Sequence, residues 1–224
     1  MQACPKFHPA SRAASLSAAL CASLAAALVL TGAPRVAQAE SSFATATATG
    51  FNASARLDFQ ITVPQVLYLQ IGAGPASGMA ANSTVSLLSF TVPANALGTG
   101  SAIAGDATAG DRGNGVVSVR IKGNVGDLHL SLSTTGNLTN PALGSTIPWD
   151  EIAVSAAASG AGGAAALQHP AWNNGTVTIP ASNTVVDLAS DWTFRYLNNQ
   201  VVGAGTYGGA GINNGRVTYT LTQP

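Results

Sequence analysis

Cysteine is almost absent from this chain, and charged residues are scarce. Both cysteines, Cys4 and Cys21, lie within the first 39 residues. The rest of the chain therefore forms no disulfide and offers neither a thiol nucleophile nor a cysteine-ligated metal site. Only 8% of the residues are charged, so hydroxyl and amide groups must supply most of the polar surface. A fold of this chain has to depend on packing and hydrogen bonds.

A long uninterrupted apolar run occurs only near the N-terminus, over residues 13–30. Basic residues precede it, and the small residues Ala37 and Ala39 follow it on either side of a glutamine. This order predicts a secretory signal peptide over residues 1–39, cut before Glu40, and export to the periplasm, the cell surface or the medium. A membrane anchor is the alternative, because a run of about 18 residues is at the short edge of what spans a bilayer.

Removal of residues 1–39 changes the charge balance of the chain. Three of the nine basic residues precede the predicted cut, whereas all nine acidic residues follow it, so the mature chain has six basic residues against nine acidic ones and a net charge of −3. A weakly acidic chain of this kind is not typical of proteins that bind nucleic acid or an anionic membrane surface. We expect neither partner, and no membrane span after cleavage.

Apolar and polar residues alternate with a period of two through most of residues 40–224. In residues 53–63, "ASARLDFQITV", the apolar positions form one face and the polar positions the other, which predicts a half-buried strand. Gly, Pro and Asn separate some eight to ten such segments, and no amphipathic helix is evident. The pattern predicts an all-β, antiparallel sandwich or barrel in a single domain, residues 40–224.

Four further segments give specific expectations. Residues 84–92, "TVSLLSFTV", predict a strand with a β-bulge at the doubled leucine. Residues 115–134 predict a hairpin that turns at Gly123–Gly126. Residues 191–198 predict an aromatic strand separate from the shorter one before it. The final run, residues 216–222, predicts a closing strand that pairs inside a sheet.

No set of residues with the spacing of a catalytic or metal site stands out, and we expect neither an enzyme nor a cofactor. His129 falls on the polar face of a predicted strand and His169 in a loop, and no serine lies in a G-x-S-x-G context. Asp150 and Glu151 are adjacent, so on a strand they point to opposite faces and cannot act as a carboxylate pair.

The acidic loop "GDATAGDRGNG" has the oxygen ligands that hard cations prefer, at Asp106, Asp111 and Asn114. Its spacing differs from that of a calcium loop, and a solvated turn is the simpler interpretation.

Tryptophans could form a platform for a sugar ring. Of the three, Trp172 in "HPAWNNG" is predicted to be exposed, with Asn173 and Asn174 beside it as hydrogen-bonding groups. Trp192 is predicted to be core because it alternates with other aromatic residues. These residues define a possible ligand-binding site for a glycan or a protein.

Both ends of the mature chain resemble a known family. The stretch "TATATGFNASARLDFQITVPQVLYLQIG" near the start and "GAGTYGGAGINNGRVTYTLTQP" at the end resemble exported bacterial pilin-like and spore-coat-like β-sandwich surface subunits. The resemblance implies an immunoglobulin-like β-sandwich of about 8–10 strands. It also implies assembly by donation of an N-terminal strand to a neighbouring subunit.

On that resemblance, the extension over residues 40–50 and its border would form the assembly strand. The residues concerned are Phe43, Ala44, Ala46, Ala48 and Phe51. The chain departs from the family in having no cysteine near the first strand, and its alanines are small for the side-chain pockets of an acceptor.

Two functions follow as hypotheses. The first is an exported, non-enzymatic structural or adhesive surface protein, a pilin-like subunit that assembles with itself or with a surface partner. The alternative is a soluble extracytoplasmic module that binds a glycan or a protein through Trp172 and its neighbours.

Overall fold

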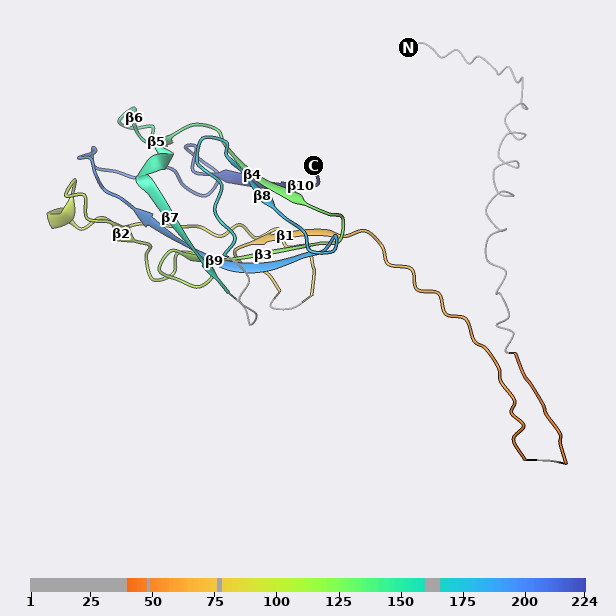
Figure 1. Ribbon diagram of the computed structural model, residues 1–224. Coiled ribbons are helices and arrows are strands. Elements are labelled where there is room, and N and C mark those ends of the chain that lie inside the picture. The colour runs from red at the N-terminus through yellow and green to blue at the C-terminus, as the bar shows by residue number, and fades with distance from the viewer. Residues whose placement is uncertain (1–39, 48, 76–77, 160–165) are drawn as a thin grey trace, which may run out of the picture. The chain divides into compact units, whose positions relative to one another are not determined.

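The computed structural model describes residues 40–47, 49–75, 78–159 and 166–224 (Figure 1). The predicted signal peptide, residues 1–39, and Ala48 of the expected assembly strand lie outside these ranges. The chain divides into two units, residues 1–62 and residues 63–224, which are considered separately. The compact unit thus begins at Val63, twelve residues or so after the boundary expected from the sequence.

The regular secondary structure of residues 63–224 is almost all β, as predicted. The strands are β1 (Leu67–Ile71), β2 (Ile103–Ala104), β3 (Val116–Gly123), β4 (Leu128–Thr134), β5 (Leu138–Asn140), β6 (Ser145–Ile147), β7 (Ile152–Ala158), β8 (Thr176–Ile179), β9 (Val186–Tyr196) and β10 (Val217–Thr222). Two single-turn 3-10 helices, Ala94–Ala96 and Trp149–Glu151, interrupt them. Within the described residues, no helix has the length and apolar character needed to cross a membrane.

The strands form two main antiparallel sheets and a small ribbon. The larger sheet has the order β1-β3-β9-β2, with β7 also paired to β9, the smaller has the order β10-β4-β8, and β5 pairs with β6. Alternate side chains of β3, β4 and β9 are buried and join one apolar cluster. Both main sheets contribute to this cluster, so the chain is an antiparallel sandwich.

The predicted hairpin of β3 and β4 is wrong. Strand β3 pairs with β1 and β9, whereas β4 pairs with β10 and β8. The connection over residues 124–127 therefore passes from one sheet to the other. The apolar faces of the two strands were predicted correctly, but they join one apolar cluster from two different sheets. A period of two specifies a buried face and does not specify a partner.

Strand β9 joins two segments that were predicted as separate strands. It runs for 11 residues and pairs with β7 along one edge and with β3 and then β2 along the other, since Arg195 and Tyr196 each have one partner in β7 and one in β2. Trp192, Phe194 and Tyr196 are buried, as predicted. The polar Ser190 in its middle is also buried, because its Oγ accepts a hydrogen bond from the Leu167 N–H at 2.7 Å.

Residues 84–92 lie extended but form no strand pairing, contrary to the prediction of a bulged strand. Leu88, Phe90 and Val92 pack against the core, whereas Val85 and Leu87 are 67% and 52% exposed. Their backbone bonds go to a loop: the Ser89 and Leu87 carbonyls accept from Asp106 and Gly110. The segment has the side-chain alternation of a strand without a neighbouring strand.

Residues 53–62, in the other unit, also lack a strand pairing and are exposed throughout, as is Val63. The prediction of a half-buried strand here is wrong for the single chain. Its apolar side chains remain uncovered: Leu57 is 62% exposed, Phe59 84%, Ile61 87% and Val63 70%. In the described part of the chain, this regular apolar face is left exposed, which is unusual for a soluble domain.

Candidate functional site

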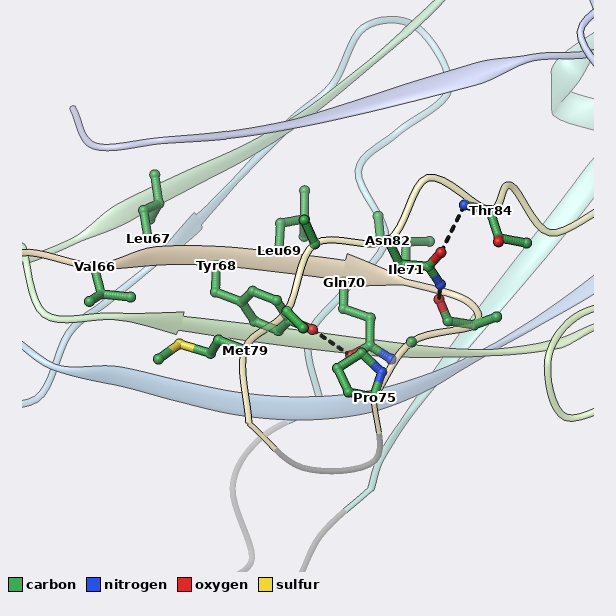
Figure 2. Close-up of a pocket in the computed structure, with 14 residues that line it drawn as sticks. Val66, Leu67, Tyr68, Leu69, Gln70, Ile71, Pro75, Met79, Asn82 and Thr84 are labelled. Carbon is green, nitrogen blue, oxygen red and sulfur yellow. Dashed lines mark hydrogen bonds between the residues drawn. The ribbon is translucent and has the colours of Figure 1, made fainter.

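The edge of β1 is open. Strand β1 pairs only with β3 in the described part of the chain. A hollow of about 540 Å³ is lined by every residue from Val66 to Ile71 and by the loop that follows (Figure 2). Since successive side chains of a strand point to opposite faces, a hollow lined by consecutive residues follows the edge of the strand. Its backbone groups are the natural partners of an added strand.

Apolar side chains form part of the surface beside this edge. Figure 2 shows Tyr68 on the side of β1 toward Pro75 and Met79, whereas Leu67 and Leu69 point to the other side. Leu67 and Met79 are 44% and 51% exposed. Leu69 and Ile71 are half-buried and contact the core. A second chain laid along this edge would cover apolar side chains on both faces of β1.

Hydrogen bonds fix the far wall of the hollow. The Asn82 side chain donates through Nδ2 to the Ala73 carbonyl at 2.8 Å and accepts from the Thr84 N–H at 2.9 Å (Figure 2). Gly72 adopts a φ of +81°, and a Cβ there would lie 2.5 Å from Ser86 Oγ. Only glycine allows both this backbone conformation and this approach. The start of this loop is thereby tied to residues 82–86.

Residues 40–51, which the sequence suggested as the assembly strand, are also largely exposed. Phe43 and Phe51 are 90% and 57% exposed, Ala46 is exposed and Ala44 is half-buried. A bidentate ion pair joins Arg56 to Glu40, with Nε 2.7 Å and Nη2 3.0 Å from the carboxylate oxygens. Both partners are exposed, so this pair contributes little to stability.

The possible ligand site at Trp172 differs from the expectation. Trp172 is half-buried: it stacks on Trp149 with ring centroids 5.1 Å apart, and its Nε1 donates to the Ile152 carbonyl at 2.7 Å. One ring face is thus occupied by protein. Asn173 and Asn174 are exposed in the following turn, where Asn174 has a φ of +55°. The three residues lie together at this turn, with Trp172 half-buried where full exposure was expected.

An aromatic cluster around His169 was missed by the sequence analysis, which placed this residue on the surface. Its ring lies 4.6 Å from that of Trp172, 4.8 Å from Trp192 and 5.6 Å from Tyr219. Its Nε2 forms a 2.7 Å hydrogen bond with the Tyr219 hydroxyl. Burial lowers the pKa of His169 to about 4 and raises that of Tyr219 above its usual range. No local sequence signal joins residues fifty positions apart.

This cluster predicts a loss of stability in mild acid. The pKa of His169 is about 4 in the folded chain and 6.5 when unfolded, so the unfolded state binds the proton more tightly. The free energy of unfolding therefore has its full value above pH 6.5 and decreases as the pH drops toward 4. The decrease is about 2 kcal/mol after allowance for the partial exposure of His169. Urea unfolding at several pH values measures this loss. His169→Gln should remove the dependence, and parallel curves for the two proteins would contradict it.

The two acidic residues considered for a cation accept hydrogen bonds from segments on either side of their loop. Asp106 accepts from the Thr91 N–H and hydroxyl at 3.0 and 3.2 Å, and Asp111 accepts from the Ser118 N–H at 2.8 Å. Among residues 40–224 as described, no group of three acidic, histidine or cysteine side chains could hold a metal ion. Asp150 is exposed and Glu151 is buried with hydrogen bonds from Asn199.

Comparisons with models of protein families, with characterised proteins and with solved structures gave no match. The functional argument therefore depends on the open edge of β1, the uncovered apolar segment and the side chains around them.

Proposed function

We propose that this chain is an exported, non-enzymatic structural subunit that assembles with copies of itself by strand addition. The open edge of β1 in one copy accepts residues 53–63 of the next copy. The observation that supports this most directly is the coexistence, in one chain, of an unpaired sheet edge with an apolar border and an unpaired extended segment with an exposed apolar face. Each supplies what the other lacks.

The dimensions agree with strand addition. Six residues, Val66 to Ile71, line the hollow, so an added strand would pair over about 20 Å. Six paired residues of the eleven-residue donor present three alternate side chains to the acceptor. We assign these three side chains to Leu57, Phe59 and Ile61. Burial of three large apolar side chains contributes about 5–9 kcal/mol before the entropic cost of association is subtracted.

The connection between donor and acceptor disfavours pairing within one chain. Residues 53–63 could fold back on β1 only through the three residues Pro64–Val66. Hairpin loops of three residues usually end in a residue with positive φ, which a β-branched valine rarely adopts. Asn124 also holds the entry to β1, because its Nδ2 donates to the Pro64 carbonyl and its Oδ1 accepts from the Val66 N–H. The donor is therefore available to a second copy.

A peptide of residues 53–63, added to a chain that starts at Val63, should raise the Tm of that chain. At a peptide concentration one hundred times Kd the gain is about 2.7 kcal/mol, which corresponds to about 5–10 °C for a domain of this size. Differential scanning calorimetry measures the shift. A peptide of residues 40–51 tests the other candidate segment, and a scrambled 53–63 peptide is the control. If the scrambled peptide stabilises the chain equally, strand addition at this edge is excluded.

A further inference from the structure

A second hollow, of about 350 Å³, lies where β4 ends and β10 begins. Its wall consists of the last residues of β4, the first of β10 and the loop over residues 211–216. The side chains that matter for its chemistry are polar: Ser133, Thr135, Asn214, Arg216 and Thr218. The volume suits one or two sugar rings.

Arg216 is the only charged residue in the wall of this hollow. It is exposed, and within the described ranges it has neither an ion pair nor a hydrogen bond. Its guanidinium lies over Gly211: a Cβ on that residue would be 2.8 Å from Nη2 and 3.0 Å from Cζ. Gly211 has a φ of +75°. The absence of a side chain on Gly211 thus allows the guanidinium to approach closely. The N–H donors of the guanidinium remain unused.

The neighbouring wall is already ordered. Asn214 accepts through Oδ1 from the Thr135 hydroxyl at 3.1 Å and donates through Nδ2 to the Asn137 carbonyl at 3.1 Å and to Thr139 Oγ1 at 3.2 Å. In contrast, the Ser133 and Thr218 hydroxyls, which are cross-strand partners, have no hydrogen bond within the described part of the chain. The hollow therefore combines a fixed frame with free donors and acceptors, as binding sites do.

We propose that this hollow binds a carboxylate-bearing carbohydrate, with Arg216 pairing with the carboxylate and the Ser133 and Thr218 hydroxyls contacting sugar hydroxyls. A guanidinium presents two parallel N–H donors that match a carboxylate. The single positive charge in the hollow matches a monoanion better than a phosphate dianion, and the mature chain's net negative charge gives no general attraction for polyanions. This site is independent of strand addition, and the test of one leaves the other standing.

Titration of the mature chain, residues 40–224, with a galacturonic acid trisaccharide and with sialyllactose tests the site. A neutral galactose trisaccharide is the reference ligand, and isothermal titration calorimetry gives the Kd. We expect millimolar to micromolar binding of at least one acidic sugar and at least tenfold weaker binding of the neutral one. Binding of the galacturonic acid trisaccharide would identify the ligand class as a uronic acid, and binding of sialyllactose would identify it as a sialic acid. Binding of neither, or equal binding of the neutral reference, overturns the proposal.

Three variants locate the site. Arg216→Gln should weaken acidic-sugar binding about tenfold or more. Gly211→Ala retains the charge but displaces the guanidinium, so it should weaken binding similarly. Arg195→Gln removes the same charge from an exposed position on β9, outside the hollow, and should leave Kd unchanged. Equal losses in the Arg216 and Arg195 variants would show a non-specific charge effect and would overturn the assignment.

Discussion

Replacing both Phe59 and Ile61 with serine should abolish the self-assembly that we propose for residues 40–224. The two side chains are 84% and 87% exposed in the single chain, so their removal costs the fold almost nothing. In the proposed assembly they are the central anchors on the neighbouring β1 edge, and their loss removes about 3–6 kcal/mol of burial at every junction. Size-exclusion chromatography with light scattering should show oligomers for the unmodified chain and monomers for the variant. Electron microscopy should show fibres only for the former.

The opposite face of the same segment supplies the matched control. Asp58→Ser and Gln60→Ser together alter the same stretch of chain without touching its apolar positions, so assembly should persist. Both double variants should keep the Tm of the unassembled monomer. If the Asp58 and Gln60 variant also fails to assemble, the side-chain alternation on which the donor assignment depends is incorrect.

Trp192→Ala should destabilise the compact unit more than any substitution at a sequence-predicted site residue, by about 3–5 kcal/mol. Trp192 is fully buried, and its ring lies 5.6 Å from that of Tyr219 on the other sheet. Its Nε1 donates to the Leu167 carbonyl at 2.7 Å, so alanine would leave both a cavity and an unpaired acceptor. Urea unfolding followed by far-ultraviolet circular dichroism measures the change in the free energy of unfolding.

Two companion variants separate the contributions. Trp192→Phe retains most of the volume and loses the hydrogen bond, so it should cost about 1–2 kcal/mol. Phe43→Ala removes an aromatic side chain that is 90% exposed and should change the free energy of unfolding by less than about 0.5 kcal/mol. A Trp192→Ala variant as stable as Phe43→Ala would contradict the placement of Trp192 between the sheets.

Patterns within a single strand were predicted well from the sequence, because they depend on local alternation. The buried faces of β3, β4 and β9 and the inward residues of β10 follow directly from the period of two. Strand partners were not predictable in this way. The short turn between β3 and β4 suggested a hairpin, yet the two apolar faces are better covered across the sandwich than within one sheet.

The sites depend even more on distant contacts. Residues 53–63 have an ideal strand pattern and still lack a partner, which a single sequence cannot reveal because the missing partner belongs to another copy in our proposal. His169 looked like a surface residue because its apolar neighbours Trp192 and Tyr219 are far away in the chain. The Arg216 guanidinium lies close to Gly211, and the identity of the two residues does not by itself indicate this approach.

The clamp that Asn124 places on Pro64 and Val66 has a mechanical consequence. If residues up to Val63 belong to one neighbour's sheet and β1 starts at Leu67, only three residues join consecutive subunits, a span of at most about 10 Å. One of the three is proline, and Asn124 restrains the other end. Such a connection has little freedom to bend. A fibre of these subunits would therefore be stiff, with a fixed rotation from one subunit to the next.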